Sequence, residues 1–82
     1  MSIPKVSVEQ LKAARALLGW SQKDHAEKSG VSLPTIKRLE RERGPLGGLQ
    51  ETGQKLVQAL KDADVIFLEE NGEGPGVRLK KK

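Results

Sequence analysis

Apolar residues recur every three or four positions along several stretches of the chain, which is the spacing of one face of an α-helix. In the first stretch, Leu11, Ala14 and Leu18 follow this spacing. Ser7 and Gln10 stand at its start with the spacing of a capping box. The sequence therefore predicts a helix that begins just after Ser7 and ends at about Leu18.

Residues 22–39, with the sequence QKDHAEKSGVSLPTIKRL, are typical of two short helices joined by a tight turn. Ser21 precedes the first helix as its N-cap, and Gly30 can take the left-handed conformation that ends it. Ser32 can cap the second helix, whose first turn tolerates Pro34 because N–H groups there have no intrahelical partner. The residues expected to meet between the two helices are Ala26, Val31, Ile36 and Leu39. This pattern predicts a helix-turn-helix, whose second helix enters the major groove of DNA.

The outward face of the second helix is basic. Because Ile36 and Leu39 face inward, helical geometry places another set of residues on the opposite face. They are Leu33, Pro34, Lys37, Arg38 and Arg41. The set contains three cations and no acid, which suits an anionic groove. An ordinary helical hairpin with a solvated basic face is the alternative that the pattern leaves open.

A glycine- and proline-rich segment, residues 43–48 (RGPLGG), follows and should end the helix. It either brings the backbone close to a phosphate group or is only a connector. Helical spacing returns from about Leu49 or Thr52, and its apolar positions are Leu56, Val57, Leu60 and Ala63. This predicts a fourth helix, which packs beneath the two short ones and completes the core.

The C-terminal pattern changes from helical spacing to β-branched and aromatic residues. Residues 65–69 (VIFLE) and 77–79 predict two strands, and residues 70–76 (ENGEGPG) predict the turn of a hairpin. The first strand is apolar on both sides, and an isolated hairpin is only marginally stable in water. We therefore expect the arm to pair with a second subunit through Val65, Ile66, Phe67, Leu68, Val77 and Leu79. A hairpin packed on its own helices is the alternative.

Composition excludes several classes of function. With 82 residues, the chain makes one small domain without room for a deep catalytic cleft. It has no cysteine and a single histidine, His25, so we expect no disulfide, metal or cofactor. No apolar run approaches the ~18 residues of a membrane span, and no signal peptide is recognisable, which predicts a cytoplasmic protein without a membrane partner. The only tryptophan, Trp20, is expected to fold over the following helix as a hydrophobic staple.

The net charge of +4 is unevenly distributed. Residues 1–45 have a balance of +4, residues 46–72 of −3, and residues 73–82 of +3. This distribution favours a directed phosphate-binding face over general stickiness. An extended arm over residues 1–6 would bring Lys5 near a phosphate, although chain ends are commonly disordered. The lysine tail is either solvated or weakly attracted to DNA.

Residues 8–43, including LKAARALLGWSQ and KSGVSLPTIKRLE, resemble the phage repressor and Cro-like (XRE-type) family of helix-turn-helix regulators. The resemblance implies a structural ion pair between Arg15, a cation on an inward stripe, and Glu40 at the end of the recognition helix. It also implies that Gln22 contacts the DNA backbone and helps to orient base-reading groups. The DNA-binding residues expected on this basis are Gln22, Lys23, Ser32, Leu33, Pro34, Thr35, Lys37, Arg38, Arg41 and Arg43.

Some positions depart from the family pattern. His25 stands where the family usually has an apolar residue, and we expect it to be a satisfied, partly buried histidine whose burial lowers stability at acidic pH. Leu33 and Pro34 stand where polar readers are common, and they offer only apolar contacts such as those with thymine methyl groups. Specificity would then depend on Lys37 and Arg38, and arginine suits a bidentate contact with guanine.

The sequence thus predicts a mainly α protein, in which a four-helix repressor-like helix-turn-helix domain (residues 1–63) precedes a C-terminal β-hairpin or strand arm with a basic tail (residues 64–82). We expect a sequence-specific transcriptional regulator that binds double-stranded DNA as a homodimer, with the recognition helix, residues 32–42, in the major groove. It would be bacterial or phage-encoded and nucleoid-associated. The alternative is an antitoxin or other interaction module whose arm binds a partner protein. No enzymatic role is expected, because no activated nucleophile or carboxylate pair is recognisable.

Overall fold

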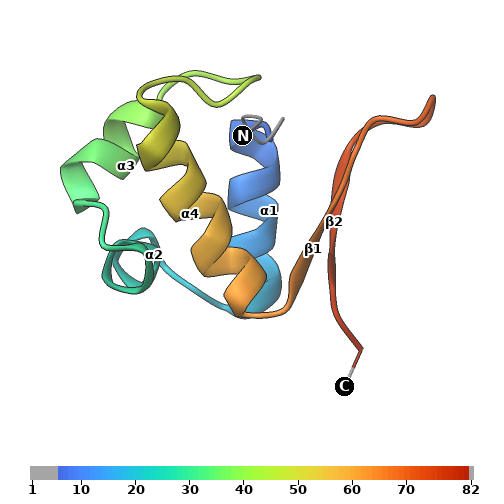
Figure 1. Ribbon diagram of the computed structural model, residues 1–82, viewed down its shortest axis with the longest axis horizontal. Coiled ribbons are helices and arrows are strands. Elements are labelled where there is room, and N and C mark those ends of the chain that lie inside the picture. Colours follow the sequence, from blue (N-terminus) through green and yellow to red (C-terminus); the bar gives the residue numbers. More distant parts are fainter. Residues whose placement is uncertain (1–5, 82) are drawn as a thin grey trace.

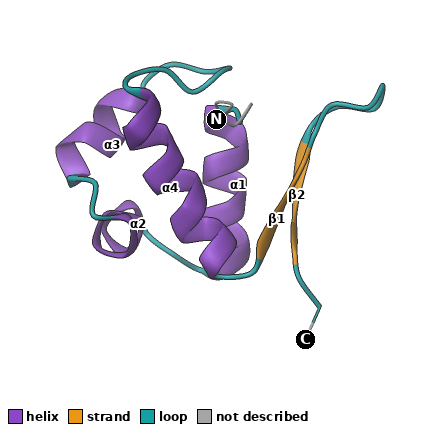
Figure 2. Cartoon of the chain, viewed as in Figure 1, coloured by secondary structure: helices purple, strands orange, loops and turns teal. Residues whose placement is uncertain are grey.

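The computed structural model describes residues 6–81, which form four helices followed by an antiparallel β-hairpin (Figures 1 and 2). In chain order the elements are α1 (Val8–Leu18), α2 (Gln22–Ser29), α3 (Leu33–Leu39), α4 (Gln50–Asp62), β1 (Val65–Leu68) and β2 (Gly76–Leu79). The predicted fold class, mainly helical with a C-terminal hairpin, is confirmed. The expected Lys5 arm and the last lysine lie outside the described residues.

Side-chain caps fix the starts of α1 and α2. At α1, the Ser7 hydroxyl accepts from the Gln10 backbone N–H at 3.1 Å, and the Gln10 amide oxygen accepts from the Ser7 N–H at 2.9 Å. Ser21 and Asp24 form the same capping box at α2. Gly30 ends α2 with a φ of 77°, a left-handed conformation that a glycine adopts without steric cost. These contacts satisfy backbone groups that a helix end leaves unpaired.

The helix expected to recognise DNA, α3, is shorter than predicted. Instead of extending over residues 32–42, α3 ends at Leu39, and the residues after its C-cap, Glu40, form a turn. The chain leaves the helix because the following loop is bonded to the start of α1. There the Val8 N–H donates to the Gly44 carbonyl at 2.8 Å, and a second bond joins the loop to residue 6. The predicted C-terminal end of this helix was therefore wrong.

The helices enclose one apolar core. It comprises Val6, Leu11, Ala14, Val31, Ile36, Leu56, Val57, Leu60 and Val65. Trp20 packs against this core, and its ring centroid lies 6.1 Å from that of His25, the fourth residue of α2. Contact between the residue before an N-cap and the fourth helical residue is the hydrophobic staple expected of Trp20. None of the helices within residues 6–81 has the length and hydropathy needed to cross a bilayer.

The hairpin packs against α1 of its own chain. The Gln10 side-chain amide donates to the carbonyls of Leu68, at 3.3 Å, and Gly76, at 3.0 Å. In the register Val65 pairs with Leu79 and Phe67 with Val77, so the side chains of these residues share one face of the hairpin.

The residues expected to dimerise differ in their exposure within one chain. Val65 is buried in the core, and Phe67 and Val77 pack against it, so all three are used within the protomer. Ile66 and Leu79 stay 39% and 42% exposed. Figure 1 shows the hairpin beside α1 at one end of the molecule and α3 at the other.

Candidate nucleic-acid interface

The solvent-facing side of α3 is narrow and basic. Pro34, Lys37 and Arg38 are exposed, whereas Leu33 is half-buried and Ile36 is fully buried. Arg41, expected on the same helical face, is exposed in the turn just after the helix. The positive charge expected on this face is therefore at the surface, while Leu33 offers only part of its side chain.

The hydroxyl groups of Ser32 and Thr35 form hydrogen bonds within the first turn of α3. The Ser32 hydroxyl accepts from the Thr35 N–H at 3.4 Å and is bonded to the Thr35 hydroxyl at 2.8 Å. Ser32 is exposed and Thr35 half-buried. Both can face a ligand, but each hydroxyl already has a partner within the turn.

A buried ion pair joins α1 to the end of α3. Arg15 Nη1 donates to Glu40 Oε2 at 2.6 Å, and Nη2 donates in parallel to Oε1. The two side chains are only 7% and 3% exposed. Burial alone would raise the pKa of Glu40, but the hydrogen bonds from Arg15 and Gln22 and the arginine charge hold that pKa below its ordinary value. The pair therefore connects the end of α3 to α1.

His25 is the second partner of Arg15. Arg15 Nη1 lies 3.0 Å from His25 Nδ1, and His25 Nε2 lies 2.9 Å from the carbonyl oxygen of Leu56 in α4. A carbonyl only accepts and a guanidinium only donates, so the neutral ring has its proton on Nε2. Burial lowers the pKa of His25, and the nearby Arg15 charge acts in the same direction. The ring is completely buried, whereas the sequence predicted a partly buried ring.

Gln22, at the start of α2, is attached to the same network. Its amide Nε2 donates to Glu40 Oε1 at 3.0 Å, and the side chain is half-buried. Its neighbour Lys23 is exposed. Across residues 6–81 every buried side-chain nitrogen and oxygen atom has a hydrogen-bond partner. The side chain expected to contact the DNA backbone therefore stands at the outer end of a fully satisfied buried network.

Arg43 is directed toward the start of α1. Its Nε lies 3.4 Å from Glu9 Oε2, and the other oxygen of Glu9 accepts from the Gly44 N–H at 3.0 Å. Hydrogen bonding from Gly44 contributes most to lowering the pKa of Glu9. The Arg43 side chain is 91% exposed, and exposed pairs are weak. Arg43 can therefore exchange this partner for a phosphate at little cost.

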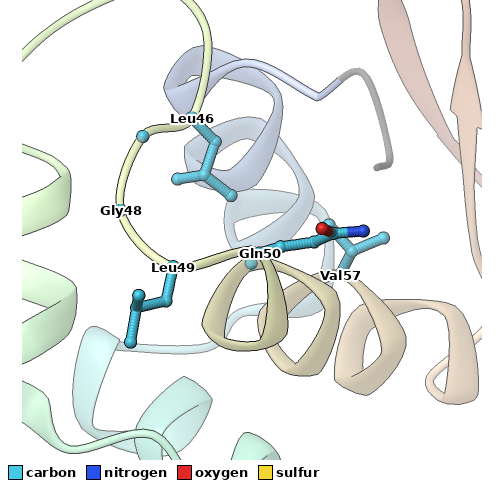
Figure 3. Close-up of a pocket in the computed structure, with 7 residues that line it drawn as sticks. Leu46, Gly48, Leu49, Gln50 and Val57 are labelled. Atoms are coloured by element: carbon cyan, nitrogen blue, oxygen red, sulfur yellow. The ribbon is translucent and has the colours of Figure 1, made fainter. Parts of the chain in front are cut away.

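A shallow hollow of about 130 Å³ lies where the loop after α3 meets α4 (Figure 3). Its lining is Leu46, Gly47, Gly48, Leu49, Gln50, Gly53 and Val57. The hollow is smaller than the roughly 300–1,000 Å³ typical of small-molecule sites. No group of three His, Cys, Asp or Glu side chains within the described residues can hold a metal ion. We therefore interpret the hollow as a small gap left where the loop packs against α4.

The loop is fitted closely to α3 beside this hollow. Gly48 has a φ of 80°, and a Cβ atom there would lie 2.7 Å from Leu39 Cδ2. Leu46 covers Gly53 in the first turns of α4, where an added Cβ would lie 3.3 Å from Leu46 Cδ2. The loop therefore packs closely against both α3 and α4.

Two side-chain contacts were not predicted from the sequence. One is the contact between His25 and Arg15, although an inward cation and an inward histidine were both recognisable. The other is the amide of Gln10, assigned only to a cap, which also anchors the hairpin. Sequence spacing gives the face of each residue but not its partner from another helix.

The arrangement of the four helices, with a capped tight turn between α2 and α3 and an exposed basic α3, defines a helix-turn-helix DNA-binding domain. Residues 11–48 match the family model described as Helix-turn-helix, the phage repressor and Cro-like (XRE-type) class. This segment is therefore similar to that family of DNA-binding regulators, and the resemblance drawn from the sequence is confirmed. The match covers a little under half of the chain and includes neither α4 nor the hairpin. No curated protein matches the chain.

Proposed function

We propose that this protein is a sequence-specific transcriptional regulator that binds double-stranded DNA as a homodimer, with α3 in the major groove. The observation that carries the proposal is that α3 combines an exposed basic face with a buried, fixed C-terminal end. Its outer residues Lys37 and Arg38 are exposed, while Glu40 is held by Arg15 in the protein interior. A short basic helix fixed at a set angle suits a groove of fixed width.

Each exposed side chain has a role in this proposal. Arg38 makes a bidentate contact with guanine, and Lys37 reads a neighbouring base or contacts a phosphate. Pro34 and the exposed part of Leu33 contact thymine methyl groups. The remaining residues contact phosphates around the groove, and they are Gln22, Lys23, Ser32, Thr35, Arg41 and Arg43.

The hairpin is the proposed dimerisation element. Residues 64–82 would serve assembly and residues 1–63 DNA binding. Ile66 and the half-buried Leu68 lie on the face opposite Val65 and remain available to a second copy, and Leu79 is exposed at the end of the packed face. The hairpin stands at the end of the molecule opposite α3, so pairing there would not obstruct the DNA face. Two recognition helices in such a dimer would meet half-sites roughly 34 Å apart.

This proposal includes no catalytic step, and it places the protein in the cytoplasm with the DNA that it binds. Acidic side chains gather around the hairpin, where Asp62, Asp64, Glu69 and Glu70 stand between the end of α4 and the turn. This acidic part of the arm would be repelled by DNA, although Arg78, Lys80 and Lys81 follow it, which agrees with an interface formed by α2, α3 and the loop after α3.

The test is selection of bound duplexes from a random pool, followed by sizing of the complex. The proposal predicts one enriched motif with two related half-sites. Arg38→Ala should lose about 1–3 kcal/mol of binding free energy, mainly through one base position. Lys61→Ala removes the same charge from the last turn of α4, and it should leave both affinity and salt dependence unchanged.

Two outcomes would contradict the proposal. Enrichment of no sequence over the starting pool would refute sequence-specific binding. A complex that contains one protein chain per duplex would refute the dimer. If sizing instead shows a stable complex with a different protein, the alternative of an antitoxin or interaction module is favoured.

A further inference from the structure

One continuous line of hydrogen bonds connects the core to the DNA-facing surface. It begins at the Leu56 carbonyl in α4, which accepts from His25 at 2.9 Å. His25 is 3.0 Å from Arg15, Arg15 donates to Glu40 at 2.6 Å, and Gln22 donates to Glu40 at 3.0 Å. Side chains from α1, α2 and the end of α3 therefore share one network, and only its last member is near the surface.

His25 determines how Arg15 is oriented within this network. Arg15 Nη1 has two N–H groups, and its partners are Glu40 Oε2 and His25 Nδ1. The ring is in turn fixed from its other side by the Leu56 carbonyl. With both ends of the imidazole held, the guanidinium plane is aligned with the Glu40 carboxylate. Glu40 Oε1 then accepts from both Arg15 and Gln22, which fixes the direction of the Gln22 amide.

We propose that His25 is a positioning residue for DNA binding, which holds Gln22 toward the DNA through Arg15 and Glu40 and releases it when the ring is protonated. This inference rests on the proposed function, because Gln22 is placed there at the DNA backbone. His25 itself is completely buried and touches no DNA.

Protonation has a definite consequence for the geometry. The new proton goes to Nδ1, the nitrogen that accepts from Arg15, so a donor then faces a donor at 3.0 Å. The charged groups that face the ring are Arg15 from α1 and Glu40 from the end of α3, while α4 presents only a backbone carbonyl. A second cation beside Arg15 competes for Glu40 and disturbs the oxygen that holds Gln22. His25 is the only histidine of the chain, so no other side chain normally titrates between about pH 5 and 8.

A double-mutant cycle tests whether His25 acts through Gln22. The probe is a fluorescein-labelled duplex with the sequence recovered by selection. His25→Leu should weaken binding about ten-fold in the wild-type background and less than about two-fold in the Gln22→Ala background. Leu60→Val, a core substitution outside the network, should have the same effect in both backgrounds. Equal effects of His25→Leu in both backgrounds would overturn the proposal.

A second measurement needs neither DNA nor a variant. The NMR signals of the Gln22 side-chain amide and the His25 ring are followed in the wild-type protein from about pH 7.5 to pH 5.5, where carboxylates stay ionised. The inference predicts that the Gln22 amide shifts with the midpoint of His25. A titrating ring with a stationary Gln22 amide would refute the link between them. If the amide shifts but no duplex is ever bound, the failure belongs to the proposed function rather than to the network.

Discussion

The most informative single change is Glu40→Gln, which keeps the size of the side chain but removes its charge. Arg15 would keep its charge at a position where its side chain is only 7% exposed, and without a counterion. The amide nitrogen that the substitution introduces would be a donor facing donors from Arg15 or Gln22. The substitution therefore leaves both an unpaired buried cation and a mismatched hydrogen bond.

The expected loss follows from burial. Removing one partner of a buried pair costs about 3–5 kcal/mol, and we take about 3 kcal/mol because the remaining amide oxygen still accepts one bond. For a domain of this size each kcal/mol lowers the melting temperature by roughly 4–8 °C, so a decrease of roughly 12–24 °C is expected. Thermal unfolding followed by circular dichroism near neutral pH measures it.

The matched control is Glu51→Gln. Glu51 pairs with Lys55 at 3.6 Å on the surface of α4, where the side chains are 80% and 53% exposed. The same chemical change there should move the melting temperature by no more than about 2 °C, because exposed pairs contribute little. If Glu40→Gln behaves like this control, the argument that the buried pair supports α3 is refuted.

Three further predictions use other parts of the fold. Gly48→Ala should destabilise the protein by about 2–4 kcal/mol, because the φ of Gly48 is positive and the added methyl group would lie 2.7 Å from a leucine of α3. Gly47→Ala, with open space around it, should be nearly neutral, and chemical unfolding of the two variants measures the difference. Because burial lowers the pKa of His25, the free energy of unfolding should be constant above about pH 6.5, the pKa of the ring in the unfolded chain. Below that pH it should decrease by at most about 1.4 kcal/mol per pH unit, and an unchanged melting temperature between about pH 8 and pH 5 would contradict this. Ile66→Glu should convert a dimer into monomers in analytical ultracentrifugation, whereas Leu49→Glu, at a 76% exposed position in the loop before α4, should not; a dimer that survives Ile66→Glu places the interface elsewhere.

Local signals predicted most of the backbone. The capping signals at Ser7 and Ser21 and the glycine at position 30 predicted three helix ends, because each acts within a few residues of its own position. The strands of the hairpin were predicted for the same reason. The end of α3 was not, because the loop after it is bonded to residues distant in the sequence, as in the bond from Val8 to Gly44.

The side-chain environment was less predictable than the backbone. Both faces of β1 are apolar in the sequence. The sequence therefore could not show that Val65 faces the core while Ile66 is exposed. The partner of Arg15 was predicted, but His25 as its second partner was not. A contact among three helices depends on their relative positions, which sequence spacing does not contain.

The most direct test of the central claim, that α2 and α3 form the DNA-binding surface, is an NMR titration with the selected duplex. The account predicts that the largest shifts fall on Gln22 and Lys23 and on residues 32–38, and that β1 and β2 are unaffected at ratios below one duplex half-site per chain. Shifts concentrated on the hairpin, or equal shifts with a scrambled duplex at moderate salt, would contradict it.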